Sequence, residues 1–298
     1  MKILEDCSLC PRNCHVNRSA GKTGYCGQTA ELKVARASLH LWEEPCISGS
    51  NGSGTVFFTG CSLGCVYCQN YQISTGMAGK KITTERLSDI FLELQHQQAS
   101  NINLVTPTHY VPQIIEAIDL SRAKGFNIPV VYNTSGYEKT ETIRLLSGYA
   151  DVYLPDLKYK SPELSGRYSG CPDYFKQASG AIAEMVRQTG RPEFNEEGIM
   201  TKGVIVRHLV LPGCIEDSKE IIRFLYHTFG DAIYISIMNQ YTPLAPIVRY
   251  PELNRRLSGK EYDEVVEYAI SLGIENGFIQ EGEAASESFI PDFDGQGV

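Results

Sequence analysis

Three cysteines lie close together in the sequence, spaced so that they can share one metal centre. They are Cys61, Cys65 and Cys68, and Gly60 and Gly64 permit a tight backbone around them. A [4Fe–4S] cluster usually takes four cysteine ligands, so three would leave one iron with an open coordination position, where a metal centre can carry out chemistry. The spacing therefore predicts a catalytic iron–sulfur cluster. The alternatives are a zinc knuckle that takes its fourth ligand from elsewhere, or three packed thiols.

A second group of cysteines precedes this segment. Eight of the ten cysteines fall within the first 68 residues, and disulfide frameworks are typical of short secreted chains rather than of a chain of this length. Four thiolates in one short segment suit a second iron–sulfur cluster or a closed zinc site, and the sequence leaves both open. The four residues are Cys7, Cys10, Cys14 and Cys26.

The remaining cysteines carry weaker signals. Cys46 ends the polar segment 40–46, which also contains His40, Glu43 and Glu44. These side chains can reach the site, but a solvated linker is the favoured interpretation, and Cys46 is a candidate for a hidden fourth ligand. Cys171 and Cys214 are predicted to be buried thiols.

Composition excludes several classes of function. The 298 residues include 27 basic and 35 acidic side chains, for a formal charge of −8. Nucleic-acid binding, which needs a basic surface, is not expected. No apolar run approaches the ~18 residues of a membrane span, and acids stand where a signal peptide would be apolar. We therefore expect a cytoplasmic protein with neither membrane nor nucleic acid as a partner.

Apolar runs and amphipathic segments alternate from Thr55 onward. Short runs of this kind are typical of strands buried on both faces, and the segments between them have apolar spacing near 3.6. Such units predict a partial (β/α)6 barrel of the TIM type. The predicted strands are 55–60, 101–107, 130–135, 152–158, 203–211 and 234–240. The predicted helices are 85–98, 111–124, 141–149, 172–189, 217–229 and 260–272.

Three regions follow from these patterns. Residues 1–50, which fit neither the strand nor the helix period, are predicted to form a cysteine-rich cap, and residues 51–280 the barrel. Residues 281–298 carry five acids and no base, which favours a solvated tail. The alternative is a strap over the barrel mouth, anchored by Phe289, Ile290 and Phe293.

Polar side chains follow several predicted strands, at the end where barrels keep their active sites. Arg207 and His208 lie within one strand and point to opposite faces, so one of them is expected to face the barrel interior. Lys158 beside Asp156 can bind a carboxylate while the acid meets an amine or a ribose, or the two can form a local ion pair. The strand-end residues are Asn133, Thr134, Ser135, Asp156, Lys158 and Gln240.

These motifs resemble the radical S-adenosylmethionine (SAM) superfamily, whose signature is CxxxCxxC with an aromatic residue before the last cysteine, here Tyr67. The segments 52–70, 156–158 and 207–213 are similar to the branch around pyruvate formate-lyase activating enzymes. The CxxCPRxC segment at 7–14 is similar to its uncharacterised PflX-like relatives. The family's GGE segment is absent here, and Thr106-Pro107-Thr108-His109 stands in its place.

The resemblance implies that Cys61, Cys65 and Cys68 hold a [4Fe–4S] cluster and that SAM binds its fourth iron. Tyr67 would contact adenine, and Thr106 and Thr108 would help to bind the amino group. A low-potential donor of the flavodoxin or ferredoxin type would reduce the cluster. The resulting radical would abstract hydrogen either from a glycyl radical enzyme or from a peptide or small molecule. An iron–sulfur electron-transfer protein or a zinc scaffold is the non-enzyme alternative.

Overall fold

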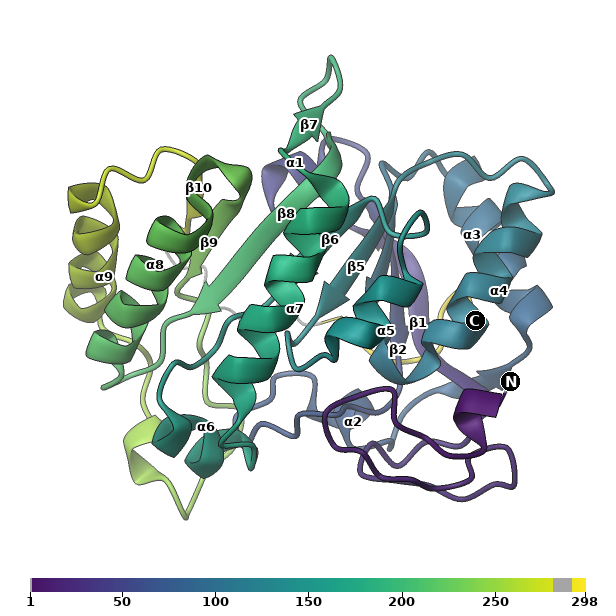
Figure 1. The fold of residues 1–298 in the computed structure, drawn as a ribbon, viewed down its shortest axis with the longest axis horizontal. Coiled ribbons are helices and arrows are strands. Elements are labelled where there is room, and N and C mark those ends of the chain that lie inside the picture. The colour runs from purple at the N-terminus through teal and green to yellow at the C-terminus, as the bar shows by residue number, and fades with distance from the viewer. Residues whose placement is uncertain (1, 281–290) are drawn as a thin grey trace.

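A computed structural model describes residues 2–280 and 291–298, and its centre is one mostly parallel sheet (Figure 1). The parallel strands follow chain order across the sheet, and each of the first six coincides with a predicted strand. Every residue of the first four is buried, as expected for strands covered on both faces. The parallel strands are β2 (Ser53–Phe58), β4 (Ile102–Val105), β5 (Val130–Thr134), β6 (Val152–Pro155), β8 (Met200–Leu209), β9 (Tyr234–Met238) and β10 (Gly277–Ile279).

Antiparallel strands extend one edge of this sheet. At that edge β1 (Leu32–His40) pairs with β2, and β3 (Lys80–Ile82) pairs with β1. β7 (Glu193–Phe194) lies away from that edge and forms a hairpin with the start of β8. The expectation that residues 1–50 lack a strand is therefore wrong for β1. The register of β1 against β2 shifts between Val34 and Arg36, and such a bulge interrupts the alternation that marks a strand in a sequence.

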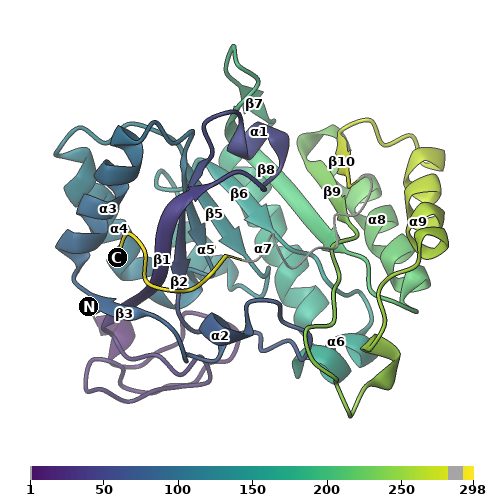
Figure 2. The same ribbon diagram turned by 180° about the vertical axis from the view of Figure 1, so that it is seen from behind.

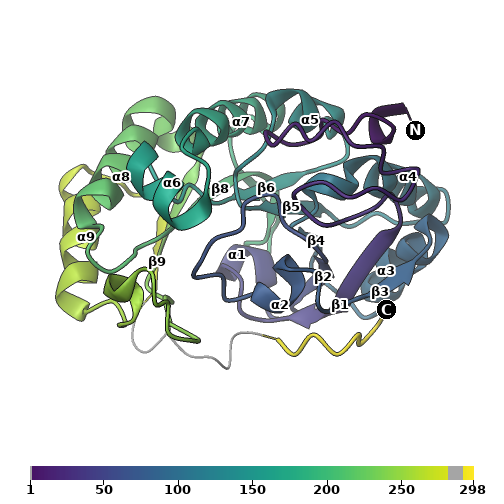
Figure 3. The same cartoon turned by 90° about the horizontal axis from the view of Figure 1, so that it is seen from below.

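Helices connect successive parallel strands and cover the outer face of the sheet, which curls into an open, barrel-like wall (Figure 3). The predicted α/β fold, a partial barrel built of βα units, is confirmed. Side chains such as Phe91 and Ile114 pack from these helices against Val56 of β2. The connecting helices are α3 (Thr84–His96), α4 (Val111–Arg122), α5 (Thr140–Leu145), α7 (Tyr174–Thr189), α8 (Ile215–Phe229) and α9 (Gly259–Ser271).

Shorter helices lie in the loops. α6 was not predicted from the sequence, although Ser161 caps it by accepting a hydrogen bond from the N–H of Leu164, and Gly170 ends it in the left-handed conformation. The short helices are α1 (Pro45–Ser48), α2 (Tyr71–Ser74), α6 (Pro162–Ser169) and the 3-10 turns Lys2–Leu4, Thr108–Tyr110, Gly230–Ala232 and Pro251–Leu253. Among the described residues, no helix combines the length and apolarity that crossing a membrane requires.

Residues 291–298 run along β1 (Figure 2). The N–H of Ala37 donates to the carbonyl of Gln296 at 2.9 Å, and the N–H of Gly295 donates to that of Ala35 at 3.0 Å. The ring of Phe293 meets that of Phe57 edge-on, with centroids 5.4 Å apart. This segment is therefore bonded to β1, while the acidic side chains of Asp292 and Asp294 remain exposed. The other proposed anchors, Phe289 and Ile290, lie outside the described residues.

Candidate active site

The loop that follows β2 carries the three predicted cluster ligands, and two glycines shape it. Gly60 and Gly64 have φ angles of +95° and +75°, which residues with side chains rarely adopt. A Cβ on Gly60 would lie 2.8 Å from the carbonyl oxygen of Cys26, and one on Gly64 would lie 2.6 Å from the hydroxyl of Tyr25. The N-terminal cap therefore packs directly on this loop.

Cys61, Cys65 and Cys68 line a cavity of about 190 Å³, and all three are free thiols. The N–H of Leu63 donates to Sγ of Cys61 at 3.3 Å, and the hydroxyl of Ser169 donates to Sγ of Cys65 at 3.1 Å. Burial raises the pKa of Cys68 to about 12, and the charges of Cys65 and Cys61 add to that shift. A metal must therefore displace these protons when it binds. Hydrogen bonds to the sulfurs suit an anionic cluster, so this donor set fits an iron–sulfur centre with three cysteine ligands.

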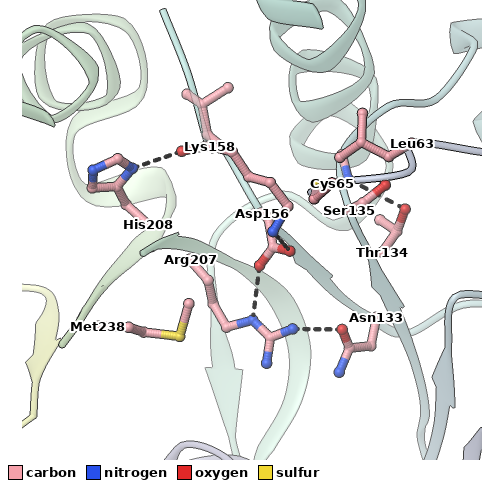
Figure 4. A network of polar contacts seen from close by, with 12 residues as sticks. Leu63, Cys65, Asn133, Thr134, Ser135, Asp156, Lys158, Arg207, His208 and Met238 are labelled. Carbon is pink, nitrogen blue, oxygen red and sulfur yellow. Dashed lines mark hydrogen bonds and ion pairs between the residues drawn. The ribbon is translucent and has the colours of Figure 1, made fainter. Parts of the chain in front are cut away.

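Charged side chains at the ends of β6 and β8 complete this cavity (Figure 4). Nζ of Lys158 lies 2.6 Å from Oδ2 of Asp156, and Nε of Arg207 lies 3.3 Å from Oδ1 of the same residue. Burial alone would raise the pKa of Asp156, but Lys158 and Arg207 together hold that pKa below its ordinary value. A buried acid between two cations offers complementary charge to a zwitterion, such as the amino-acid end of SAM.

Arg207 also binds a carboxylate from the segment that precedes the barrel. Its Nη1 donates to Oε2 of Glu43 at 3.0 Å, and its Nη2 donates to Oδ1 of Asn133 at 2.6 Å. Nδ2 of Asn103 donates to the other oxygen of Glu43 at 2.9 Å. The interpretation of residues 40–46 as a solvated linker is therefore wrong, because the segment supplies a carboxylate to a buried cation.

A second cavity of about 380 Å³ adjoins the first and shares Asn133, Arg207 and Gln240 with it. Glu44 lines this larger cavity and is 8% exposed. Burial raises the pKa of Glu44, and the positive charge of Arg207 acts in the opposite direction. Oε2 of Glu44 has no hydrogen-bond partner among the residues that the structure describes. The other walls include His40, Phe57, Ser236, Phe278, Gln280 and Pro291.

Most of the side chains predicted to contact the cofactor do line the smaller cavity, together with the three cysteines. Two do not. Thr108 donates its hydroxyl to Glu138 at 2.6 Å, behind the cavity wall. The side chains that do line the cavity come together because the carboxyl ends of parallel strands meet at one edge of the sheet. The residues that line the cavity are Tyr67, Thr106, Asn133, Thr134, Ser135, Asp156, Lys158, Arg207 and Gln240.

His208 is the second residue that lies away from the cavity. Its ring nitrogens are 2.8 Å from the carbonyl oxygen of Leu157 and 2.9 Å from the hydroxyl of Ser218, which belongs to α8. Burial lowers its pKa to about 4, so the ring is neutral at pH 7. Of the two neighbours in β8, Arg207 faces the site, and the geometry does not support a cofactor contact for His208.

A chain of hydroxyl groups that ends at Cys65 was missed in the sequence. The hydroxyls of Tyr67 and Tyr159 are 2.6 Å apart, and that of Tyr159 is 2.9 Å from Oγ of Ser169. Ser169 donates to Sγ of Cys65, so each hydroxyl can donate towards the sulfur. Hydrogen bonds of this kind tune the reduction potential of an iron–sulfur centre. The cap signals of α6, which carries Ser169, were the available clue.

The other barrel cysteines are not part of this site. Cys46 is 7% exposed, packs with Met200 and Ile205, and does not line either cavity. Cys171 is buried, as predicted, and its thiol lies 3.3 Å from the carbonyl of Ser169. Cys214 is only partly buried, at the start of α8.

The cap cysteines lie in the loops of residues 2–31 (Figure 3). The N–H of Tyr25 donates to Sγ of Cys14 at 3.2 Å. The N–H of Leu63 donates in the same way to Sγ of Cys61 in the cluster loop. Burial raises the pKa of Cys10 to about 12, and the charges of Cys26 and Cys14 act in the same direction. The thiols therefore lie near enough to influence one another.

Comparison with known proteins agrees with this geometry. The model of the radical SAM superfamily matches residues 55–225, which is more than half of the chain and runs from β2 into α8. An uncharacterized protein of Methanocaldococcus jannaschii is 31% identical over 276 residues, which is 90% of this chain and 75% of that protein.

A solved structure shares the fold. The FeFe-hydrogenase maturase HydG from Carboxydothermus hydrogenoformans superimposes with a TM-score of 0.51 and 13% identity, covering 79% of this chain and 55% of that one. SuiB of Streptococcus suis, solved with its precursor peptide SuiA, gives a TM-score of 0.48 and 14% identity over 75% of this chain. This chain spans about half the length of these two proteins, 47% in the case of SuiB.

Proposed function

This chain belongs to the radical SAM superfamily, and on that premise we propose that it abstracts a hydrogen atom from a compact polar substrate bound beside the cluster loop. The observation that carries the proposal is the pair of adjoining cavities. One is lined by three thiols and the charged strand ends, and the other by Glu43, Glu44, the shared Arg207, and polar and aromatic groups. The first suits cluster and cofactor, and the second leaves room for a substrate.

The residues of the smaller cavity would hold the cofactors. When bound, a reduced [4Fe–4S] cluster and SAM together supply a 5′-deoxyadenosyl radical that takes hydrogen from the substrate. Cys61, Cys65 and Cys68 would ligate three irons. Lys158 and Arg207 offer positive charge to the carboxylate of SAM. Other polar groups of the cavity, Thr106, Asn133, Ser135 and Asp156 among them, offer acceptors to its amino group and ribose, and Tyr67 is placed to contact adenine.

The larger cavity favours a small substrate over the loop of a partner protein. Pro291 forms part of its wall, and Phe293 packs on Phe57 beside it. Activation of a glycyl radical enzyme, the other function implied by the resemblance, would require the mouth to admit a glycine-bearing segment of another protein. Oε2 of Glu44 lies buried without a partner in the described residues. An amine or hydroxyl on the substrate would satisfy it.

Two finer points belong to the same proposal. The CxxCPRxC segment at residues 7–14 supports placement in the PflX-like subgroup. A low-potential protein of the flavodoxin or ferredoxin type would supply the electron, since a cluster must be reduced before it can cleave SAM.

The test is anaerobic cleavage of SAM. The full chain is reconstituted with iron and sulfide and reduced, and 5′-deoxyadenosine is measured after SAM is added. We expect product from the parent and from Cys46→Ala, whose thiol lies outside both cavities, and none from Cys65→Ala. Cleavage that survives in Cys65→Ala, or is lost in Cys46→Ala, would refute the ligand assignment. A parent that carries the cluster but never cleaves SAM would show an electron-transfer centre instead.

A further inference from the structure

Arg18 is a buried cation without an acidic partner. It is 1% exposed, and it donates to the carbonyl oxygens of Gln28, Thr29 and His109 at 3.1, 2.6 and 2.5 Å. In the described part of the chain, no Asp or Glu lies within ion-pair distance of its guanidinium group. The three carbonyls accept three of its five N–H groups. They do not cancel its charge, and burying an uncompensated charge is costly. A negative charge is therefore required next to it.

Among the groups that contact Arg18, a cysteine sulfur can carry this negative charge. Nη1 of Arg18 lies 3.9 Å from Sγ of Cys7. The carbonyls of Gln28 and Thr29, which Arg18 also contacts, come two and three residues after Cys26. The guanidinium therefore lies among the cap segments that carry Cys7 and Cys26, and the same Nη1 that faces Cys7 also donates to the carbonyl of His109, which ties the cap to the barrel.

The backbone of the cap is bent so that its cysteines come together. Cys7 and His15 are joined by a hydrogen bond of 2.9 Å from the N–H of His15 to the carbonyl of Cys7. Asn13 and His15, on either side of Cys14, adopt positive φ angles of 45° and 53°, which are uncommon outside glycine. A Cβ on Gly24 would lie 2.7 Å from Sγ of Cys14, so glycine is needed where this sulfur turns towards the segment that contains Cys26.

We propose that Cys7, Cys10, Cys14 and Cys26 bind a second iron–sulfur cluster, with Arg18 as its buried counter-cation. Four thiols would lose their protons to solvent as the cluster binds, and the resulting anionic centre would balance the guanidinium. No group of three His, Cys, Asp or Glu side chains within residues 2–280 and 291–298 is placed to hold a single metal ion. This holds equally for the first cysteine loop, and a four-iron cluster spaces its ligands more widely than one zinc ion does.

This second centre would lie against the active-site loop. Nε of Arg12, which lies between Cys10 and Cys14, donates to the carbonyl oxygen of Ser62 at 2.8 Å, and its Nη2 donates to that of Leu63 at 2.9 Å. The same guanidinium stacks 3.8 Å from the ring centroid of Tyr25. The ligand segments of the two centres are therefore joined by direct contacts.

Metal content tests the proposal without any need for SAM cleavage. The full-length triple variant Cys61→Ser, Cys65→Ser, Cys68→Ser keeps the four cap cysteines and, besides them, Cys46, Cys171 and Cys214. After anaerobic reconstitution we expect about four irons and four sulfides per chain, and their loss when Cys10→Ser and Cys26→Ser are added. Adding Cys171→Ser and Cys214→Ser instead is the matched control and should change nothing. A triple variant with no metal, or with one zinc and no sulfide, would overturn the proposal, whatever the outcome of the SAM assay.

The role of Arg18 is tested in the triple variant by a redox titration followed by electron paramagnetic resonance. Arg18→Met removes the positive charge, so the midpoint potential of the cluster should become more negative, while Arg18→Lys should stay close to the parent. If Arg18→Met does not fold, Arg18→Gln provides the same comparison and keeps hydrogen-bond donors for the carbonyls. Equal potentials in all folded variants would overturn the counter-cation role.

Discussion

The carboxyl group of Glu138 should make the stability of the protein depend on pH. Glu138 is fully buried, and its Oε1 accepts hydrogen bonds from the hydroxyls of Thr108, Tyr132 and Thr134 at 2.6, 3.2 and 2.5 Å. Oε2 has no partner among the described residues. Burial raises its pKa to about 7, although the three hydroxyls act in the opposite direction. Thr134 lines the cofactor cavity, so this carboxyl group supports the site from behind.

The sign of the effect follows from the raised pKa. The folded state binds the proton more tightly than the unfolded chain, whose glutamate has the ordinary pKa of 4.5. The contribution of Glu138 to stability is therefore greatest below pH 4.5 and is lost as the pH rises towards 7. The full shift corresponds to about 3 kcal/mol, of which about 2 kcal/mol falls between pH 5.5 and pH 8. For a chain of 298 residues, 2 kcal/mol is about 3 °C in the unfolding midpoint.

Glu138→Gln removes this titration while keeping the shape of the side chain. The unfolding midpoints of parent and variant are measured by anaerobic thermal unfolding at pH 5.5 and pH 8. Relative to the variant, the midpoint of the parent should be about 3 °C lower at pH 8 than at pH 5.5. Glu197→Gln, at an exposed turn, is the matched control and should show no such shift. A difference that is the same at both pH values would refute the claim that burial holds Glu138 protonated.

Three further predictions concern the sulfurs and the C-terminal segment. Ser169→Ala removes the hydrogen bond to Cys65, so the potential of the first cluster should fall by about tens of millivolts in a redox titration; an unchanged potential would contradict this. Gly24→Ala should displace Sγ of Cys14 and lower the iron content of the cap to a large extent, whereas Gly21→Ala, in open space, should lower it less. Phe293→Ala loses an aromatic contact of about 1 kcal/mol, so carboxypeptidase should remove the last residues about fivefold faster.

The sequence was a good guide to the strands and to the cluster loop, because both are local patterns. Buried parallel strands are short and continuously apolar, and three closely spaced cysteines can reach one centre whatever surrounds them. The polar groups at the ends of β5 and β6 were predictable for a related reason, since parallel strands bring their carboxyl ends to one edge. β1 was not, because a bulge breaks its alternation.

Long-range contacts account for most of what the sequence did not reveal. Glu43 meets Arg207 across 164 positions of the chain, and nothing in the polar segment around Glu43 distinguishes a buried carboxylate from a solvated one. The orientation of β8 decided between Arg207 and His208, and that depends on how the strand sits between β6 and β9. Both features are set by tertiary packing rather than by local preference.

The bonds of Arg12 imply an order of assembly. Besides its contacts with the cluster loop, its Nη1 donates to the carbonyl oxygen of Gly170 at 2.8 Å and its Nη2 to that of Ser169 at 3.2 Å. The ribosome adds Gly170 only after more than half of the chain has been made, long after the cluster loop. During synthesis, Arg12 therefore lacks two of its acceptors when the cluster loop has already been made. The nascent chain thus passes through a stage in which both sets of cysteines are complete but Arg12 is not yet bonded to Ser169 and Gly170 at the end of α6. Iron delivered at that stage would reach its ligands before the cap is locked in place.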